Sequence, residues 1–372
     1  MVISAARSSG HVYSGSLRIP LRNVWLLLLY ASDLFKSMDA SQVQFERDAE
    51  EIPDLAAEIL VHQVTARLRR NLTFGYRRQE QDLTRLRGRI DLLRTERFQL
   101  LSRGRIACGF DELTVDTDRN QFVLAALNSI APLVKSPGLA IKCRELSGAL
   151  TSAGVSTVPS RRLQLNTQQF GRSDAQDRPM IDAARLSLDL ALPTEEKGAS
   201  SLGIHSTDER WMQRLFERAV GGFYSVVLPR PQWTTRTGTK LNWQTTDRSP
   251  GIGGMLPGMQ TDILLVDRDG GRELVIDTKF TALLKPGKRD GEERLKGGYI
   301  YQMYAYLRSQ ELPDRAMSMT SAGLLLHPSI DVTHDEYMVV NDHAIRFATV
   351  DLAGSASEIR ARLLAVVEVA GR

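Results

Sequence analysis

The chain has 372 residues, of which 42% are hydrophobic and 25% are charged, and its net charge at pH 7 is +4. This balance is typical of soluble globular domains and excludes collagen-like, coiled-coil and largely disordered chains. The longest apolar run has eight residues, too few to span a membrane, and the first 15 residues lack the apolar core of a signal peptide. We therefore expect a cytoplasmic protein of two or three domains with no membrane attachment.

The first elements of the chain are predicted to be helical. Residues 17–35 begin with an extended stretch, because Pro20 disfavours helical geometry at the residue before it, and continue as a buried helix. Apolar residues at mostly helical spacing predict a second helix over 52–70. Further along, a loop with capping candidates from Asp116 to Asp118 leads into more helix, which continues to about residue 192.

Between these helices, residues 67–105 form a strongly basic stretch. It holds twelve arginines against four acidic residues, a local balance of +8. Segments with strand-like composition around Gly75 and Gly88 predict basic strands or a hairpin. Such a concentration of charge indicates either a polyanionic or acidic partner, or a solvated surface held by salt bridges.

A polar stretch at 194–207 is the predicted boundary between an amino-terminal domain over 1–195 and a carboxy-terminal domain over 205–372. In the second domain, Ser206 and Ser355 each precede a glutamate by three residues, which is a capping box that begins a helix. The order of helices and strands there is typical of an α/β sandwich with a mixed sheet flanked by helices. The predicted strands cover 259–267, 273–280, 323–329 and 336–341, and the helix among them covers 297–310.

The first two of these strands are joined by Asp269-Gly270. Asp-Gly between apolar runs predicts a two-residue type I′ turn, so residues whose numbers sum to 539 should pair across the strands. Asp262 and Asp277 satisfy that sum, and Lys279 lies two residues further along on the same face. Two opposed carboxylates repel each other unless a cation lies between them.

A divalent metal would remove this repulsion. Mg²⁺ is suitable, because it takes one or two carboxylates and completes its shell with water and phosphate. Asp262 and Asp277 are then the candidate ligands, and Lys279 would orient an attacking water or help to deprotonate it. The alternative is a structural ion pair between Asp277 and Lys279, since this short pattern is common by chance.

Three further residues are candidates for the same site. Glu217 lies near the apolar face of the preceding capped helix, and Gln302 and Tyr306 lie four residues apart on one face of the following helix. Each alone is typical of a core or a surface. Together with the strand residues, their order resembles the PD-(D/E)xK nuclease superfamily, with Thr261-Asp262 where Pro-Asp is usual.

The amino-terminal half sharpens this resemblance. The segments 19–33, 86–95 and 110–127 are similar to the McrC subunits of McrBC modification-dependent restriction systems. The family implies an antiviral nuclease subunit that cuts methylated double-stranded DNA with Mg²⁺. Its partner would be McrB, an AAA+ GTPase ring whose hydrolysis it stimulates. The resemblance also allows two McrC chains to pair and bridge two rings.

The resemblance assigns a role to each candidate residue. Asp262 and Asp277 would bind Mg²⁺, and Lys279 would be the catalytic lysine. The amino-terminal domain would dock a stalk into the motor ring, and residues 67–105 are the candidate for that stalk. Glu217 would be an auxiliary metal or water contact, and Gln302 with Tyr306 would order the site near the DNA.

The chain contains no GxxxxGK[ST] motif, so we expect that it does not hydrolyse nucleotide itself. The glycine-rich residues 251–258 instead predict a loop before the first strand of the site. Two cysteines without metal-ligand spacing, and six histidines without an HxxxH or HExxH pair, disfavour zinc. Two other functions stay open at this point: a scaffold that activates a motor ring without cutting, and a stand-alone metal-dependent nuclease.

Overall fold

The structure is a computed structural model. The chain folds into two compact units. The first unit combines Met1–Ile52 with Leu192–Arg372, and the second is Pro53–Ala191. The residues that the structure describes are 11–14, 17–37, 51–70, 72, 74–157, 177–195, 209–286 and 292–368.

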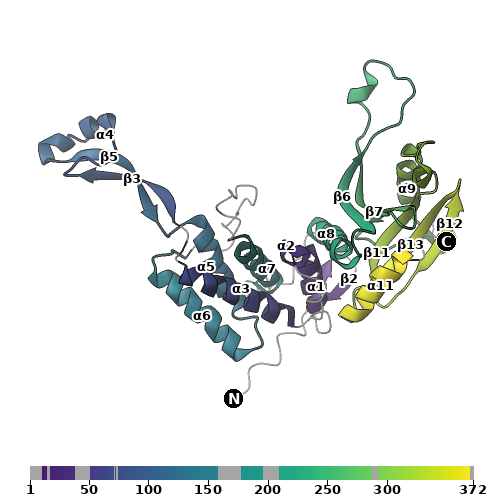
Figure 1. Ribbon diagram of the computed structural model, residues 1–372, viewed down its shortest axis with the longest axis horizontal. Helices are drawn as coiled ribbons and strands as arrows, with labels where there is room; N and C mark the ends of the chain where they lie inside the picture. The colour runs from purple at the N-terminus through teal and green to yellow at the C-terminus, as the bar shows by residue number, and fades with distance from the viewer. Residues whose placement is uncertain are drawn as a thin grey trace. The chain divides into compact units, whose positions relative to one another are not determined.

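A mixed six-stranded sheet forms the centre of the first unit (Figure 1). Its strands are β6 (Trp233–Leu241), β7 (Met259–Asp267), β8 (Arg272–Thr278), β11 (Ala322–Ser329), β12 (Asp335–Val340) and β13 (His343–Asp351). The strand order is β12-β13-β11-β8-β7-β6, in which β11 runs parallel to both β8 and β13 and the other neighbours are antiparallel. The predicted mixed sheet is therefore confirmed.

Helices flank this sheet, as predicted. They are α1 (Leu21–Ala31), α2 (Asp33–Ser37), α8 (Glu209–Val227), α9 (Gly297–Ser309), α10 (Ala316–Met319) and α11 (Ala356–Glu368). Two ribbons of two strands pair β1 (His11–Ser14) with β2 (Leu17–Pro20) and β9 (Leu284–Pro286) with β10 (Glu293–Leu295). Among the described helices, none combines the length and the hydropathy that a bilayer span requires.

The two faces of the sheet have different covers. On one face Gly323 of β11 lies against Met303 and Leu307 of α9, so closely that an added Cβ would come within 2.6 Å of the Met303 side chain. On the other face Arg346 of β13 donates a hydrogen bond of 2.8 Å to the carbonyl of Val366 in α11. Glycine at position 323 thus allows α9 to approach the central strands.

The amino-terminal helices belong to this same unit, which corrects the predicted domain over 1–195. Gly222 of α8 faces the backbone carbonyl of Tyr30 in α1 so closely that any larger residue would clash. Asn23 is fully buried and donates hydrogen bonds of 2.8 and 2.9 Å to the carbonyls of Leu352 and Gly354. The chain therefore leaves the first unit near residue 52 and returns near residue 192, and the sequence pattern indicated only the second crossing.

The register of β7 and β8 is as predicted, although the turn between them is not. The pair Ile263 and Ile276, and every other pair in the ladder, sums to 539. The connection has four residues, 268–271, and positive φ occurs at Gly271 rather than at both residues of the Asp-Gly pair. The prediction of a two-residue type I′ turn was therefore wrong. The four-residue turn has the same centre, so the register is unchanged.

Other local predictions have mixed outcomes. The capping box at Ser355 is confirmed, because its N–H donates to Glu358 Oε2 at 2.7 Å and the N–H of Glu358 donates to Ser355 Oγ at 3.3 Å. Its counterpart at Ser206 lies outside the described residues. Residues 251–258 form a loop with one short 3-10 turn, as expected. Strands β6 and β13 were not predicted.

The second unit is largely helical. Its helices are α3 (Ile52–Arg69), α5 (Asp118–Ile130), α6 (Pro137–Ser152) and α7 (Arg178–Glu195). Thr117, which lies within the predicted capping range 116–118, caps α5 by accepting a hydrogen bond of 3.2 Å from the N–H of Asn120. Asp116 instead accepts hydrogen bonds from Ser156, Gln121 and Arg77, which hold the loop in place. Burial works to raise the pKa of Asp116, but these hydrogen bonds lower it to about 2.

Residues 75–114, which we call the ribbon, extend from these helices (Figure 1). The ribbon has β3 (Gly75–Leu83), β4 (Arg89–Ile90), the short helix α4 (Leu92–Arg97) and β5 (Ile106–Thr114). Its strand order is β3-β5-β4, and both pairs are antiparallel. The predicted basic strands are thus confirmed, with α4 as an added element.

Candidate functional site

The candidate site lies where β7 and β8 separate. Their ladder ends at Ile263 and Ile276, and the next pair in register is Asp262 and Asp277. At that point β8 remains paired with β11, where Asp277 lies opposite Leu325. The two strands therefore part at the aspartates, which leaves room between them that a continuous ladder would have filled.

The side chain of Asp262 bridges this gap. Its Oδ2 accepts hydrogen bonds from the N–H of Thr278 at 2.7 Å and from the Thr278 hydroxyl at 2.8 Å. The carboxylate thus takes the place of a strand carbonyl as the acceptor for a backbone donor. This arrangement fixes the orientation of Asp262 from the strand that carries Asp277 and Lys279.

Asp277 and Lys279 form a buried ion pair. Lys279 Nζ lies 2.8 Å from Asp277 Oδ2, and the side chains are 15% and 2% exposed. Burial raises the pKa of Asp277 to about 6, although Lys279 works to lower it. Burial also works to lower the pKa of Lys279, but Asp277 and then Asp262 outweigh it and hold that pKa above its usual value. Lys279 is therefore a cation at neutral pH.

Glu217 of α8 belongs to the same electrostatic cluster. Burial, followed by the charges of Asp262 and Asp277, raises the pKa of Glu217, and Lys279 lowers it. These influences place the Glu217 carboxyl within electrostatic reach of all three strand residues. Glu217 thus converges with Asp262, Asp277 and Lys279, as the order of these residues in the sequence indicated.

The donor set suits a hard divalent cation with few protein ligands. Across the described ranges, no three His, Cys, Asp or Glu side chains are grouped so that they could hold a metal ion together. A metal at this site would therefore have only Asp262 and Asp277 as its protein ligands. Two carboxylates are enough for Mg²⁺, whose remaining positions are filled by water and substrate phosphate. Burial is the main cause of the raised pKa of Asp277, and repulsion from Asp262 adds to it. A bound cation would relieve that repulsion.

Gln302 and Tyr306 meet each other on α9. Gln302 Nε2 donates a hydrogen bond of 2.7 Å to the Tyr306 hydroxyl. Tyr306 is 8% exposed and packs in the hydrophobic cluster beneath α9 with Met259 and Val275. The hydrogen bonds and ion pairs of the described residues connect neither side chain to Asp262, Asp277 or Lys279. The roles of Gln302 and Tyr306 at the site therefore stay predictions.

Two residues near Lys279 were missed by the sequence analysis. Lys279 Nζ lies 5.1 Å from the centre of the Tyr299 ring, and the His327 ring centre lies 5.9 Å from the same ring. His327 is fully buried, and its Nδ1 donates to the Thr281 carbonyl at 2.8 Å. Burial lowers the pKa of His327 to about 4. Only the parallel pairing of β8 with β11 brings His327 beside Lys279, so no local pattern could have found it.

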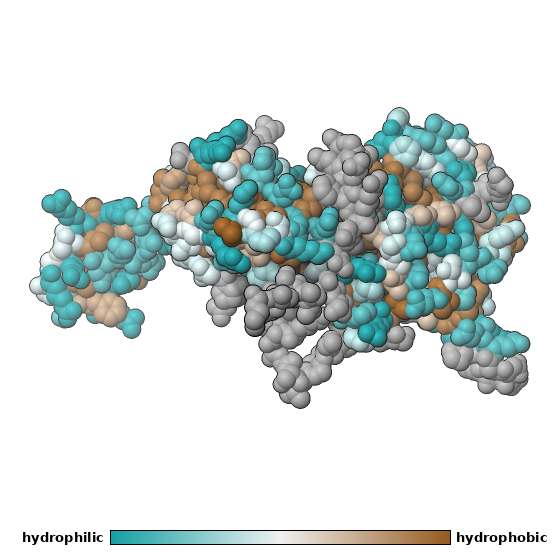
Figure 2. Space-filling view, turned by 90° about the horizontal axis from the view of Figure 1, so that it is seen from below, coloured by the Kyte–Doolittle hydropathy of each residue, from teal (hydrophilic) through white to brown (hydrophobic). Residues whose placement is uncertain are grey.

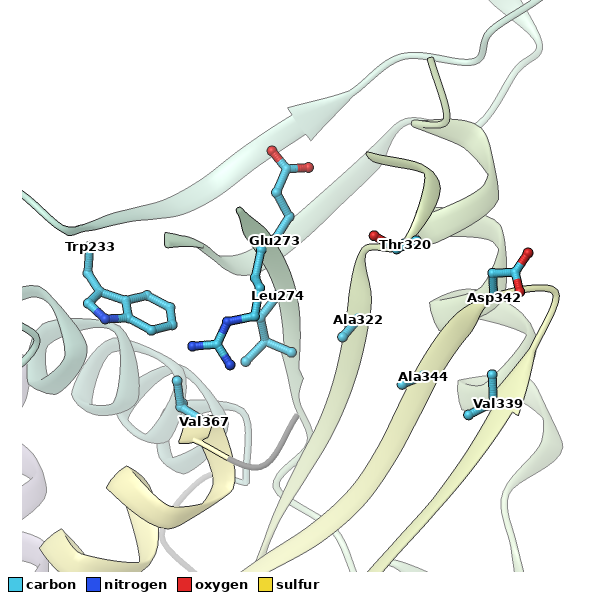
Figure 3. Close-up of a pocket in the computed structure, with 10 residues that line it drawn as sticks. Trp233, Glu273, Leu274, Thr320, Ala322, Val339, Asp342, Ala344 and Val367 are labelled. Atoms are coloured by element: carbon cyan, nitrogen blue, oxygen red, sulfur yellow. The ribbon is translucent and has the colours of Figure 1, made fainter. Parts of the chain in front are cut away.

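A separate hollow of about 260 Å³ lies at the other end of β8. Figure 3 shows a row of apolar side chains across neighbouring strands, which are Leu274, Ala322, Ala344 and Val339. Of the charged residues in its lining, Glu273 pairs with Arg315 and Arg272 pairs with Asp267, and Asp342 is one further carboxylate. The hollow lacks the grouped carboxylates and lysine found where β7 and β8 part, so the cluster of Asp262, Asp277 and Lys279 is the candidate reaction site.

The ribbon presents a second candidate surface. Figure 2 shows hydrophobic side chains among hydrophilic ones there, and Leu93 is 82% exposed with Leu92 and Leu101 each 66% exposed. Some of its arginines are paired, for example Arg94 with Asp82 at 3.2 Å. Exposed apolar residues bordered by arginine are typical of protein interfaces. This composition favours a protein partner over a merely solvated surface.

The structure thus brings two carboxylates and a lysine together where two strands of a mixed sheet part, and helices flank that sheet. This cluster is the candidate hydrolytic centre. Residues 9–328 match the family described as McrBC 5-methylcytosine restriction system component. The chain therefore belongs to that family, and the predicted resemblance is confirmed.

A curated relative and two solved structures are also similar to the chain. The Escherichia coli (strain K12) protein described as type IV methyl-directed restriction enzyme EcoKMcrBC is 25% identical over 341 residues, which cover 90% of this chain and 93% of the relative. A half-complex of Thermococcus gammatolerans McrB AAA+ hexamers with bound McrC has a TM-score of 0.39 at 14% identity, covering 93% of this chain and 76% of that chain. The T. gammatolerans McrBC complex gives a TM-score of 0.31 at 18% identity, covering 57% and 59%.

Proposed function

We propose that this chain is the DNA-cleaving subunit of a modification-dependent restriction complex, and that it hydrolyses phosphodiester bonds in methylated duplex DNA with Mg²⁺. The observation that carries the proposal is the cluster of Asp262, Asp277 and Lys279 where β7 and β8 part, in a chain of the McrBC family. The E. coli relative is described as a methyl-directed enzyme, which supports methylated DNA as the substrate.

The residues of the cluster would divide the chemistry among them. Asp262 and Asp277 would hold Mg²⁺, which when bound supplies positive charge that polarises the phosphate and makes a water more acidic. Lys279, whose pKa is raised, is a poor base. It would instead donate hydrogen bonds that orient the attacking water and stabilise negative charge as it develops on the phosphate. Thr278 keeps Asp262 in place through its two hydrogen bonds.

The energy source would be a separate subunit. The chain lacks a phosphate-binding GxxxxGK[ST] motif, and its ribbon exposes Leu92, Leu93 and Leu101 beside arginines. We therefore propose that the ribbon docks onto an AAA+ GTPase ring of the McrB type and stimulates its hydrolysis. The exposed apolar surface supports this part of the proposal, since such patches on monomers commonly mark interfaces.

The test is cleavage of methylated and unmethylated duplex DNA by the full chain with Mg²⁺, with and without the partner GTPase and GTP. The proposal predicts cutting of methylated DNA only when the partner and GTP are both present. Cutting by this chain alone would support a stand-alone nuclease instead. Stimulated GTP hydrolysis without any cutting would support a scaffold that activates the motor.

A further inference from the structure

A groove of about 410 Å³ leads away from Asp262 along α8 and β6. Asp262 and Glu217 belong to its lining, and so do three cationic residues: Lys36, Arg218 and Arg230. The groove therefore joins the candidate hydrolytic centre to a basic surface. Its elements all belong to the first unit, although Lys36 comes from α2 in the amino-terminal segment.

Both acidic and basic residues line the groove. Strand β6 follows α8 after a short connection and runs back along it, with Thr237 against Gly221. Glu217 at the start of the lining thus lies near Gly238, which faces Asp262, whereas Arg230 lies towards Thr235 at the far end. Asp262 and Glu217 are therefore at one end, with Arg218 next to Glu217 in the chain, and Arg230 is at the far end.

Gly238 leaves the Asp262 end of the groove open. The pairs Thr237–Ile263 and Thr239–Thr261 place Gly238 directly opposite Asp262 on the neighbouring strand. Its φ is +63°, and an added Cβ would lie 3.0 Å from the Gln260 side-chain nitrogen, so other residues are disfavoured there. Glycine at 238 therefore adds no side chain that could cover Asp262.

The cations of the groove keep their charge available. Within the described part of the chain, Arg218 donates to the carbonyl of Ala31 at 3.2 Å and Arg230 donates to the carbonyl of Ser225 at 2.9 Å. Carbonyl oxygens orient a guanidinium without neutralising it. Lys36 pairs with Asp33 three residues earlier in an exposed contact, and such pairs contribute little.

We propose that this groove binds the phosphodiester backbone of the cleaved strand beside the scissile phosphate. The inference rests on the proposed function, because the metal site supplies the point from which the strand enters the groove. Lysine, arginine, serine and threonine are the residue types that contact DNA phosphates. Ser225 follows Glu217 in α8 by eight positions, a rise of about 12 Å. One strand advances about 3.4 Å per phosphate, so the groove has room for about three nucleotides.

The position of the strand can be measured by photo-crosslinking. A photoreactive benzoylphenylalanine replaces Lys36 in one full-length variant and Arg268 in the control, in both cases with Lys279→Ala so that methylated duplex DNA stays uncut. Arg268 is an exposed cation in the turn at the opposite end of β7. We expect position 36 to crosslink to one strand within about three nucleotides of the cut site, and position 268 to give no such specific crosslink.

Charge reversal gives an independent reading. Lys36→Glu and Arg230→Glu should each weaken binding of methylated duplex DNA and lower the slope of log affinity against log salt by about 1, as expected for one lost phosphate contact. Arg268→Glu makes the same charge change as Arg230→Glu and should leave the slope unchanged. Unaltered melting midpoints in circular dichroism would show that the variants fold.

The outcomes separate this inference from the proposed function. One outcome overturns the inference while wild type still cuts DNA. In that outcome positions 36 and 268 crosslink alike, and the three charge-reversal variants have the same DNA affinity and salt slope, so the groove does not hold the strand. If wild type cuts nothing under any condition, the proposed nuclease fails. In that case, specific crosslinks at position 36 and a changed salt slope would still support the groove as a site for nucleic-acid backbone.

Discussion

Asp262 accepts two hydrogen bonds from Thr278, the residue that separates Asp277 from Lys279. One strand thus carries a carboxylate and the lysine of the candidate site and also orients the second carboxylate. The parting of β7 and β8 makes this possible, because it leaves the Thr278 N–H without a strand partner on that side. The geometry of the cluster therefore depends on where the ladder ends.

The Thr278 hydroxyl is predicted to matter for activity more than for stability. Thr278→Val keeps the shape of the side chain and the backbone donor but removes one of the two hydrogen bonds to Asp262. Loss of a hydrogen bond to a charged group corresponds to about 1.5 kcal/mol, so the cleavage rate should fall about tenfold. Cleavage and melting measurements check this, and Thr278→Ser should retain most of the rate. Equal rates for the valine variant and wild type would show that Asp262 does not need this contact.

The amino-terminal segment is predicted to be essential for the stability of the sheet unit. Asn23→Leu would leave the buried carbonyls of Leu352 and Gly354 without their donor. We expect the free energy of unfolding of this unit to fall by about 2–4 kcal/mol. Urea unfolding measures the loss, and Arg22→Leu, a less buried neighbour in the same helix, is the control. A stability loss no greater than that of the control would contradict the packing described for α1.

Burial of neutral His327 predicts a pH dependence of stability. Its pKa is about 4 in the folded chain and about 6.5 when unfolded, so the unfolded state binds the proton more readily. This contribution to stability is complete above about pH 6.5 and is lost as the pH falls towards 4, by about 3 kcal/mol in all. His327→Gln, which retains a donor for Thr281, should flatten that part of the profile. A profile unchanged by the substitution would argue against a buried neutral histidine.

The exposed leucines of the ribbon are predicted to bind the partner. Leu93→Asp should weaken binding of the GTPase ring by tenfold or more, because truncating or charging a central apolar contact commonly costs more than 1 kcal/mol. Ile141→Asp, at an exposed position of α6, is the matched control. Equilibrium binding and stimulated GTP hydrolysis provide the two measurements. If both variants bind alike, the ribbon is not the docking surface.

Much of the sheet unit could be predicted because its signals are local. The strand at 259–267 and the capping box at Ser355 agree with the structure, since apolar alternation and side-chain capping act over a few residues. The register that brings Asp262 and Asp277 to the end of the ladder also followed from the sequence, because the register depends only on the centre of the turn. The error in turn type did not matter for that reason.

The remaining features depend on contacts between distant parts of the chain. Nothing near Asn23 indicates that its partners are Leu352 and Gly354, and so the amino-terminal helices were assigned to the wrong domain. His327 approaches Lys279 only through parallel pairing of β8 with β11. The β6 strand was missed because threonines and Gly238 interrupt its apolar pattern, yet it forms one wall of the groove.

The proposed role of Lys279 in DNA hydrolysis can be tested by comparing three proteins. Wild type, Lys279→Ala and Lys296→Ala are assayed for cleavage of methylated duplex DNA with Mg²⁺, partner and GTP. Lys296 is the control because its ammonium lies 5.5 Å from the same Tyr299 ring. We expect Lys279→Ala to lower cleavage by about a hundredfold to a thousandfold, with GTP hydrolysis by the partner still stimulated. Lys296→Ala should cut much as wild type does. Full cleavage by the Lys279→Ala variant would contradict a role for Lys279 in hydrolysis.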